Sequence, residues 1–213
     1  MSSRVRWIAV ACSVLVVASG TRAAPADDYR LGLQAYNRGD VVGAMSALRA
    51  PAKAGHGPSQ SLLAFILDKA DFVEEAFALY RDAAAQGEPD GHAGLAVAYL
   101  AGRGVTKDEK AALQHFSKAA DLGHAKSIEI VADAYVRGNF GLAGAGGPAA
   151  VAAVRRAAER GHLSSMDALA EAYQSGRWQL AADAQQAAQW KAKAVELRAR
   201  LSQPASAPRK GSR

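Results

Sequence analysis

The residues of this sequence whose type could most readily do chemistry are its five histidines, because imidazole binds metals and transfers protons near neutral pH. Three of them, His56, His124 and His162, directly follow the glycines Gly55, Gly123 and Gly161, which recur at similar intervals along the chain. This shared position predicts one histidine per repeated unit, with equivalent side chains roughly 10 Å apart. Bonds from nitrogen to zinc are about 2 Å long, so these histidines could not share one ion. We therefore interpret them as structural or surface residues.

The rest of the sequence gives little sign of a catalytic or cofactor site. His92 and His115 have no evident partner. No zinc-protease helix motif, Ser-His-Asp order or phosphate-binding loop is visible. We therefore predict no cofactor and no bound metal, and we expect a protein that is not an enzyme. Catalytic residues can also meet from distant parts of a chain, so an enzyme stays open as an alternative.

Two pairs of carboxylates form a further candidate site. Glu129 and Asp133 are four residues apart, as are Asp167 and Glu171, so each pair would share one helix face. Like charges at this spacing destabilise an isolated helix by a few tenths of a kcal/mol. Two such pairs indicate a cationic partner, and the plainer alternative is a solvated helix face. A divalent cation or paired catalytic carboxylates are less favoured interpretations.

The net charge does not indicate a nucleic-acid partner. The formal charge is +6. Six of the basic residues lie near the two ends of the chain: Arg4, Arg6, Arg22, Arg209, Lys210 and Arg213. The residues between them are close to neutral, so they form no basic footprint for phosphates.

The N-terminus has the pattern of an export signal. Arg4 and Arg6 precede an apolar run over 7–18, and small residues follow it. This order predicts a signal peptide over 1–23, with cleavage after Ala26 as a variant. The run is short for a membrane span, so we predict no integral span after cleavage. A retained anchor and lipid attachment at Cys12, the one cysteine, are the alternatives.

A unit of two helices recurs along the rest of the chain. Counting starts from Gly55, Gly87, Gly123 and Gly161, which lie 32, 36 and 38 residues apart. The eighth residue after each is a branched aliphatic (Leu63, Leu95, Val131, Leu169) and the twelfth is large (Leu67, Tyr99, Tyr135, Tyr173). A period in this range indicates a helical solenoid, and no stretch alternates like a strand. We predict an all-α fold in which Tyr135 is buried between helices, so that truncating it costs roughly 3–5 kcal/mol.

The variable parts of the units are predicted to be turns and ends. The turn inside the helix pair is short at Gly39-Asp40 and at Ala70-Asp71, and it lengthens in the third and fourth units. A long charged helix over 181–201 is expected to close the array. Residues 202–213 hold two prolines and three basic residues, which predicts a disordered basic tail.

The third unit resembles the Sel1-like repeat family. It reads Leu95-Ala96-x-x-Tyr99-x-x-Gly102-x-Gly104-Val105-x-x-Asp108, and the fourth unit continues with Gly123-His124-Ala125, Val131-Ala132 and Tyr135. The first two units are more similar to the related tetratricopeptide repeats. The resemblance covers roughly 28–196 and implies a right-handed α/α superhelical solenoid of about five helix pairs over 27–201.

The resemblance also implies a binding surface, because the first helix of each pair lines the concave groove of tetratricopeptide-like arrays. Its exposed positions would give an apolar half and an acidic half. The apolar half would contain Phe65, Ala93, Val97 and Leu100, and the acidic half Glu129, Asp133, Asp167 and Glu171. A protein or peptide ligand, and no nucleic acid, is the expected partner.

The expected function is that of an exported scaffold, periplasmic or secreted. It would bind another envelope protein or a peptide segment in its groove, in regulation or in envelope and exopolysaccharide assembly, roles that the resemblance implies. Two alternatives stay open. One is a hydrolase acting on β-lactam or cell-wall substrates, although the paired cysteines of such relatives are missing after cleavage. The other is a secreted host-directed effector.

Overall fold

The computed structural model describes residues 24–203, which form ten α-helices and one short 3₁₀ helix. The helices are α1 Pro25–Asn37, α2 Val41–Lys53, α3 Gly57–Lys69, α4 Val73–Ala85, α5 Pro89–Ala101, α6 Glu109–Asp121, α7 Ala125–Arg137, α8 Pro148–Glu159, α9 Leu163–Ser175, η1 Arg177–Gln179 and α10 Ala184–Ser202. These described residues contain no strand. The predicted signal peptide, 1–23, and nearly all of the predicted tail lie outside them.

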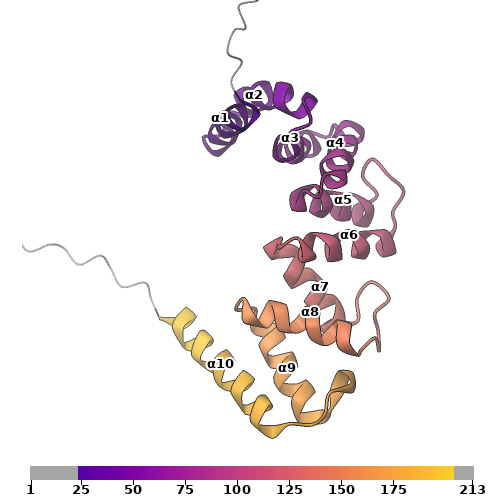
Figure 1. Ribbon diagram of the computed structural model, residues 1–213, viewed down its shortest axis with the longest axis vertical. Coiled ribbons are helices and arrows are strands. Elements are labelled where there is room, and N and C mark those ends of the chain that lie inside the picture. Colours follow the sequence, from indigo (N-terminus) through magenta and orange to yellow (C-terminus); the bar gives the residue numbers. More distant parts are fainter. Residues whose placement is uncertain (1–23, 204–213) are drawn as a thin grey trace, which may run out of the picture.

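The helices stack in sequence order into a curved array of five pairs (Figure 1). Each helix packs on its neighbours along the chain, and the first helices of adjacent pairs also meet, α3 with α5 and α7 with α9. The predicted all-α solenoid of about five helix pairs is therefore confirmed. The first nine α-helices have 12 or 13 residues each, whereas α10 has 19.

Burial follows the repeat positions that the sequence indicates. The eighth residue of all four units is at most 7% exposed: Leu63, Leu95, Val131 and Leu169. The residue four positions after each repeating glycine is small and buried as well, and it lets helices approach closely: Ser59, Gly91, Ser127 and Ser165. At Gly91, for example, an added Cβ would lie 2.7 Å from the backbone nitrogen of Ala84, so α4 and α5 touch through their backbones.

The twelfth position is less uniform than predicted. Leu67 is 1% exposed and Tyr173 is 8% exposed, but Tyr99 and Tyr135 are only half-buried. The prediction that Tyr135 is buried between helices was wrong. Its ring borders a shallow pocket whose α8 side is formed by Ala149, Ala152, Ala153 and Arg156. The three alanines are too small to cover the ring.

The turns inside the helix pairs lengthen along the array, as the sequence indicates. Residues 102–108 and 138–147 form long turns that leave from the same edge (Figure 1).

In the last pair, η1 places Trp178 in the core at 7% exposure, although its φ of 58° is unusual for a residue other than glycine. A Cβ on Gly146 would lie 3.2 Å from this ring. Trp178 therefore connects the last pair to the turn before α8.

The final helix begins three residues later than predicted, at Ala184 instead of Ala181. Asp183 causes this shift because its carboxylate accepts hydrogen bonds from the backbone nitrogens of Gln185 and Gln186, at 2.9 and 3.0 Å. A side chain that accepts from the first turn in this way fixes the start of a helix.

The core is divided into two clusters of buried side chains. One extends from Ala35 on α1 to Leu95 on α5, and the other from Ala96 on α5 to Ala194 on α10.

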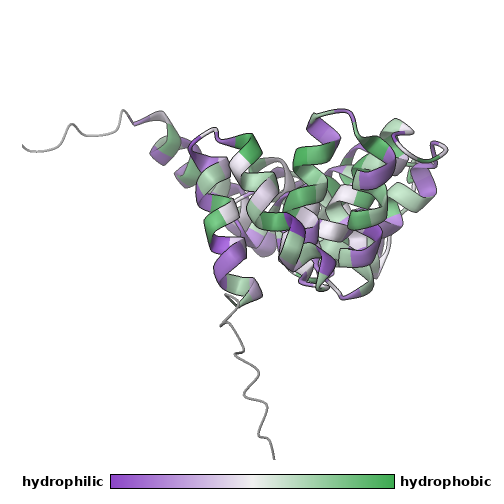
Figure 2. Cartoon of the chain, turned by 90° about the horizontal axis from the view of Figure 1, so that it is seen from above, coloured by the Kyte–Doolittle hydropathy of each residue, from purple (hydrophilic) through white to green (hydrophobic). Residues whose placement is uncertain are grey.

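Hydrophobic and hydrophilic stretches alternate along the helices (Figure 2). Between residues 24 and 203, no helix combines the length and the apolar character needed to cross a membrane.

Candidate functional site

A hollow of about 480 Å³ lies on the face formed by α1, α3 and α5. We call it the N-terminal hollow. Its walls consist mainly of apolar and aromatic side chains: Tyr29, Leu33, Pro58, Leu62, Phe65, Tyr80, Ala93, Val97 and Ala98. Phe65, Ala93 and Val97 of the predicted apolar half are thus brought together in one cavity. Leu100 does not line it; this residue is 36% exposed, one turn further along α5.

The hollow depends on a glycine of α5. Tyr80, which is 7% exposed, packs so closely on Gly94 that an added Cβ there would lie 2.2 Å from the ring. At the mouth, Phe65 is 37% exposed. The ring of Tyr36 is nearly perpendicular to it, with ring centres 6.0 Å apart, and the ammonium of Lys69 lies 5.6 Å from its ring centre. A large exposed aromatic beside a concave apolar wall is typical of a binding site.

A buried polar atom without a partner also belongs to this hollow. Ser61 lines it and is only 4% exposed, and its Oγ has no hydrogen-bond partner among the described residues. Leaving such a hydroxyl unsatisfied costs about 1–3 kcal/mol. A group that donated to or accepted from this hydroxyl would remove that cost.

The two ends of the hollow differ in charge. At one end Asp68 is compensated by Arg103, whose Nε lies 2.8 Å from the carboxylate and whose Nη2 donates to the Asp68 carbonyl at 2.7 Å. At the other end Asp90 lies 3.5 Å from Nε2 of His124. Glu88 is close to Asp90, and its pKa is raised by burial and then by that neighbouring charge. This end of the hollow is thus lined by one carboxylate, Asp90, and the second carboxylate, Glu88, lies close to it outside the lining.

The floor of the hollow offers a protonated hydroxyl. The pKa of Tyr80 is raised well above its ordinary value, first by burial and then by the charges of Asp68 and Asp90. The pKa of Tyr29 is raised too, by burial and by Asp90 and Glu88. Both phenols therefore remain neutral over the physiological pH range.

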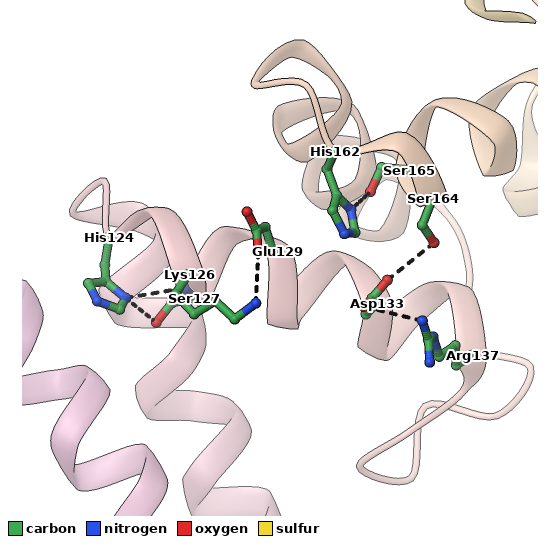
Figure 3. Close-up of polar contacts among 9 residues, drawn as sticks. All are labelled: His124, Lys126, Ser127, Glu129, Asp133, Arg137, His162, Ser164 and Ser165. Atoms are coloured by element: carbon green, nitrogen blue, oxygen red, sulfur yellow. Dashed lines mark hydrogen bonds and ion pairs between the residues drawn. The ribbon is translucent and has the colours of Figure 1, made fainter. Parts of the chain in front are cut away.

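The predicted acidic half is largely neutralised by the chain itself, and Figure 3 shows the contacts of two of its carboxylates, Glu129 and Asp133. Glu129 accepts a hydrogen bond from Lys126 at 2.9 Å, which holds the pKa of its carboxyl below the ordinary value. Asp133 lies 3.7 Å from Arg137, and Asp167 pairs with Arg198 of α10. Of these four carboxylates, only Glu171 has no ion-pair partner among residues 24–203. The charge that indicated a cationic partner here is thus mostly compensated.

The three repeated histidines are placed at helix N-termini. Nδ1 of His56, His124 and His162 lies 2.7–2.8 Å from Oγ of the serine three residues later, at the starts of α3, α7 and α9. A serine beside a histidine resembles an activated nucleophile. Ser59, Ser127 and Ser165 are each 0% exposed, however, so a substrate cannot reach them. The recurring Gly-His-x-x-Ser spacing was the signal for these contacts, and sequence reasoning did not use it.

His92 and His115 form a pair that the sequence did not reveal. They lie on α5 and α6 with their Nδ1 atoms 3.1 Å apart, and Tyr99 stacks on His115 with ring centres 5.6 Å apart. Burial lowers the pKa of both, and the charges of His115 and Lys118 lower that of His92 further. Across the described part of the chain, no three His, Cys, Asp or Glu side chains are grouped to hold a metal.

The fold and the concave hollow define an α/α repeat protein. The Sel1 repeat model matches three stretches, residues 69–88, 89–124 and 163–197. The chain therefore contains Sel1 repeats in these three stretches, which confirms the resemblance inferred from the sequence. The match at 163–197 extends across α9 into α10 and so includes the last helix pair.

Known proteins with similar structures are repeat proteins of the same kind. A Sel1 repeat protein from Oxalobacter formigenes superposes with a TM-score of 0.60 at 24% identity, covering 81% of this chain and 73% of the other. A protective antigen of uropathogenic Escherichia coli with an SLR fold gives a TM-score of 0.61 at 26% identity, covering 81% and 38%.

One curated relative is an uncharacterized protein of Neisseria meningitidis serogroup B. It is 35% identical over 120 residues, which are 54% of this chain and 25% of the relative. The chain thus spans about a quarter of the length of that relative.

Proposed function

We propose that this protein is an exported scaffold that holds a segment of another envelope protein in the N-terminal hollow. The observation that carries the proposal is the partly exposed apolar wall of Phe65 and Val97 beside the buried, unpartnered hydroxyl of Ser61. Apolar clefts with a few well-placed polar groups are the usual form of ligand sites. Such binding would serve regulation or envelope assembly.

Binding can be tested with a photocrosslinking residue placed at Val97, which lines the hollow and is 49% exposed. The matched control is Val42 on α2, which is 79% exposed and does not line the hollow. We expect one envelope protein to be captured from Val97 and not from Val42, and the capture to be lost when Phe65→Asp is added. Equal capture from both positions, or none from Val97, would contradict the proposal.

Export is supported by the N-terminal pattern of basic, apolar and small residues. The structure adds a reason to prefer one cleavage position. Because α1 begins at Pro25, cleavage after Ala23 keeps the helix whole, whereas cleavage after Ala26 removes two residues of its first turn. We expect the periplasmic form to begin at Ala24 when its N-terminus is sequenced. A full-length chain confined to the cytoplasm would refute export.

A further inference from the structure

Resting on the function proposed above, we infer that the N-terminal hollow takes a peptide segment in which an apolar side chain stands next to Lys or Arg. The apolar side chain would enter the cavity, a main-chain polar group would meet Ser61, and the cation would face Asp90, which lines the hollow next to Glu88. Each part of this assignment comes from a separate feature of the hollow.

The cavity accounts for the apolar side chain. Its volume of about 480 Å³ is within the roughly 300–1,000 Å³ that is usual for ligand pockets. Phe65 and Val97 leave much of their side chains in contact with solvent, at 37% and 49% exposure. Both would be covered by an inserted apolar side chain.

Ser61 is the reason for expecting a main-chain polar group of the segment at this position. The residue lines the hollow, and its Oγ is buried and has no partner among the described residues. Ser59, two residues earlier on α3, is equally buried but is hydrogen-bonded to His56 at 2.8 Å. The lack of a partner is therefore particular to the serine in the cavity. A hydroxyl both donates and accepts, so a peptide N–H or C=O can satisfy it.

The carboxylates at the two ends of the hollow are the reason for expecting a Lys or Arg in the bound segment. Asp68 is already paired with Arg103, so that end of the hollow offers no free carboxylate. At the other end Asp90 lines the hollow, and its charge raises the pKa of the neighbouring Glu88. The imidazole of His124 lies 3.5 Å from Asp90, and that of His56 lowers the pKa of Glu88 by less than burial and Asp90 raise it. Lys69, at the mouth, is directed to the ring of Phe65 instead. A Lys or Arg of the segment would relieve the repulsion between the two carboxylates.

The test uses three blocked eight-residue peptides with a central Leu-Phe pair, flanked on each side by Lys, by Gln or by Glu. Their affinities for the purified protein are measured by calorimetry. We expect the Lys peptide to bind at least about ten-fold more tightly than the Glu peptide. In the Glu88→Gln/Asp90→Asn variant the three affinities should converge, while that of the Gln peptide stays unchanged.

The hydroxyl is tested separately with Ser61→Ala, which should weaken all three peptides by about five- to ten-fold. Its matched control is Ser46→Ala on the exposed side of α2, which should change none of them. Unchanged binding to Ser61→Ala would overturn the role of the hydroxyl. Circular dichroism of each variant verifies that the helices are intact.

The remaining outcomes separate this inference from the proposed function. Capture of an envelope protein from Val97, together with equal affinity for the three peptides, would refute the inference and leave the function standing. No capture and no peptide binding would refute both. A dimer that dissociates when the Lys peptide is added would assign the hollow to a second copy of this chain and overturn the inference.

Discussion

Two serines of α3 carry the first prediction at the scale of single residues. Ser59→Ala removes a buried hydrogen bond to His56 and should lower the free energy of unfolding by about 1 kcal/mol. Ser61→Ala removes a buried hydroxyl that has no partner and should leave stability unchanged or raise it by up to about 1 kcal/mol. Urea unfolding of both variants measures the difference. Equal losses would show that Ser61 has a partner in the folded protein.

The histidine pair predicts a pH dependence. The pKa values of His92 and His115 are lower in the folded protein than in the unfolded chain. As pH falls, the unfolded chain binds protons first, so the stability that the pair contributes is complete above about pH 6.5 and is lost below it. We expect wild type to lose more stability between pH 7.5 and 5.0 than His92→Gln/His115→Gln does. Parallel pH profiles from urea unfolding would refute this.

At the scale of helices, the same repeat position should respond differently in different units. Tyr173 is 8% exposed and accepts a hydrogen bond from Arg155, so Tyr173→Ala should cost roughly 3–5 kcal/mol. Tyr135 is half-buried, so Tyr135→Ala should cost roughly 1–2 kcal/mol, less than its repeat position alone predicts. Thermal or urea unfolding of the two variants measures these losses in the free energy of unfolding. A larger loss at Tyr135 than at Tyr173 would contradict the packing described here.

The buried faces of the helices show which parts of the core could be predicted from the sequence. Leu63, Leu95, Val131 and Leu169 were predictable core residues because the spacing of one helix determines its own buried face. The exposure of Tyr135 was not predictable in the same way, since it depends on the size of side chains on α8 beyond a turn of variable length. The repeat spacing therefore predicts the fold, but it does not predict how deeply each repeated side chain is buried.

In the candidate site too, contacts within one helix were predictable from the sequence, and contacts between distant residues were not. Lys126 is three residues before Glu129 and Arg137 is four after Asp133, so both countercharges could have been found from the sequence. Arg198 is 31 residues from Asp167 and meets it only because α10 folds back on α9. Phe65, Ala93 and Val97 of the hollow were predicted from their helix face, but the other apolar residues that line it were not: Tyr29, Leu33, Pro58, Leu62, Tyr80 and Ala98. The lack of a hydrogen-bond partner for Ser61 was not predictable either, because it depends on every neighbouring element.

At the scale of the whole molecule, the two core clusters predict regional unfolding. In a solenoid each unit contacts mainly its neighbours, so damage stays local. Leu169→Ala, in the C-terminal cluster, should cost about 2–5 kcal/mol and speed hydrogen exchange in α7–α10 more than in α1–α3. Leu48→Ala, in the other cluster, is the matched control and should give the opposite pattern. Equal acceleration everywhere in both variants would indicate one cooperative unit.

The turn at 138–147 makes the protein suitable for a genetically encoded reporter. A Cβ at Gly141 or Gly144 would meet no atom within 4 Å, whereas Phe140 packs on Phe116 and Gly146 contacts Trp178. A fluorescent or affinity module inserted directly after Gly144 would leave both aromatic contacts in place. Loop extension costs only about 0.6 kcal/mol per doubling of length. Residues of the N-terminal hollow would remain unmodified, so the tagged protein could follow partner binding in living cells.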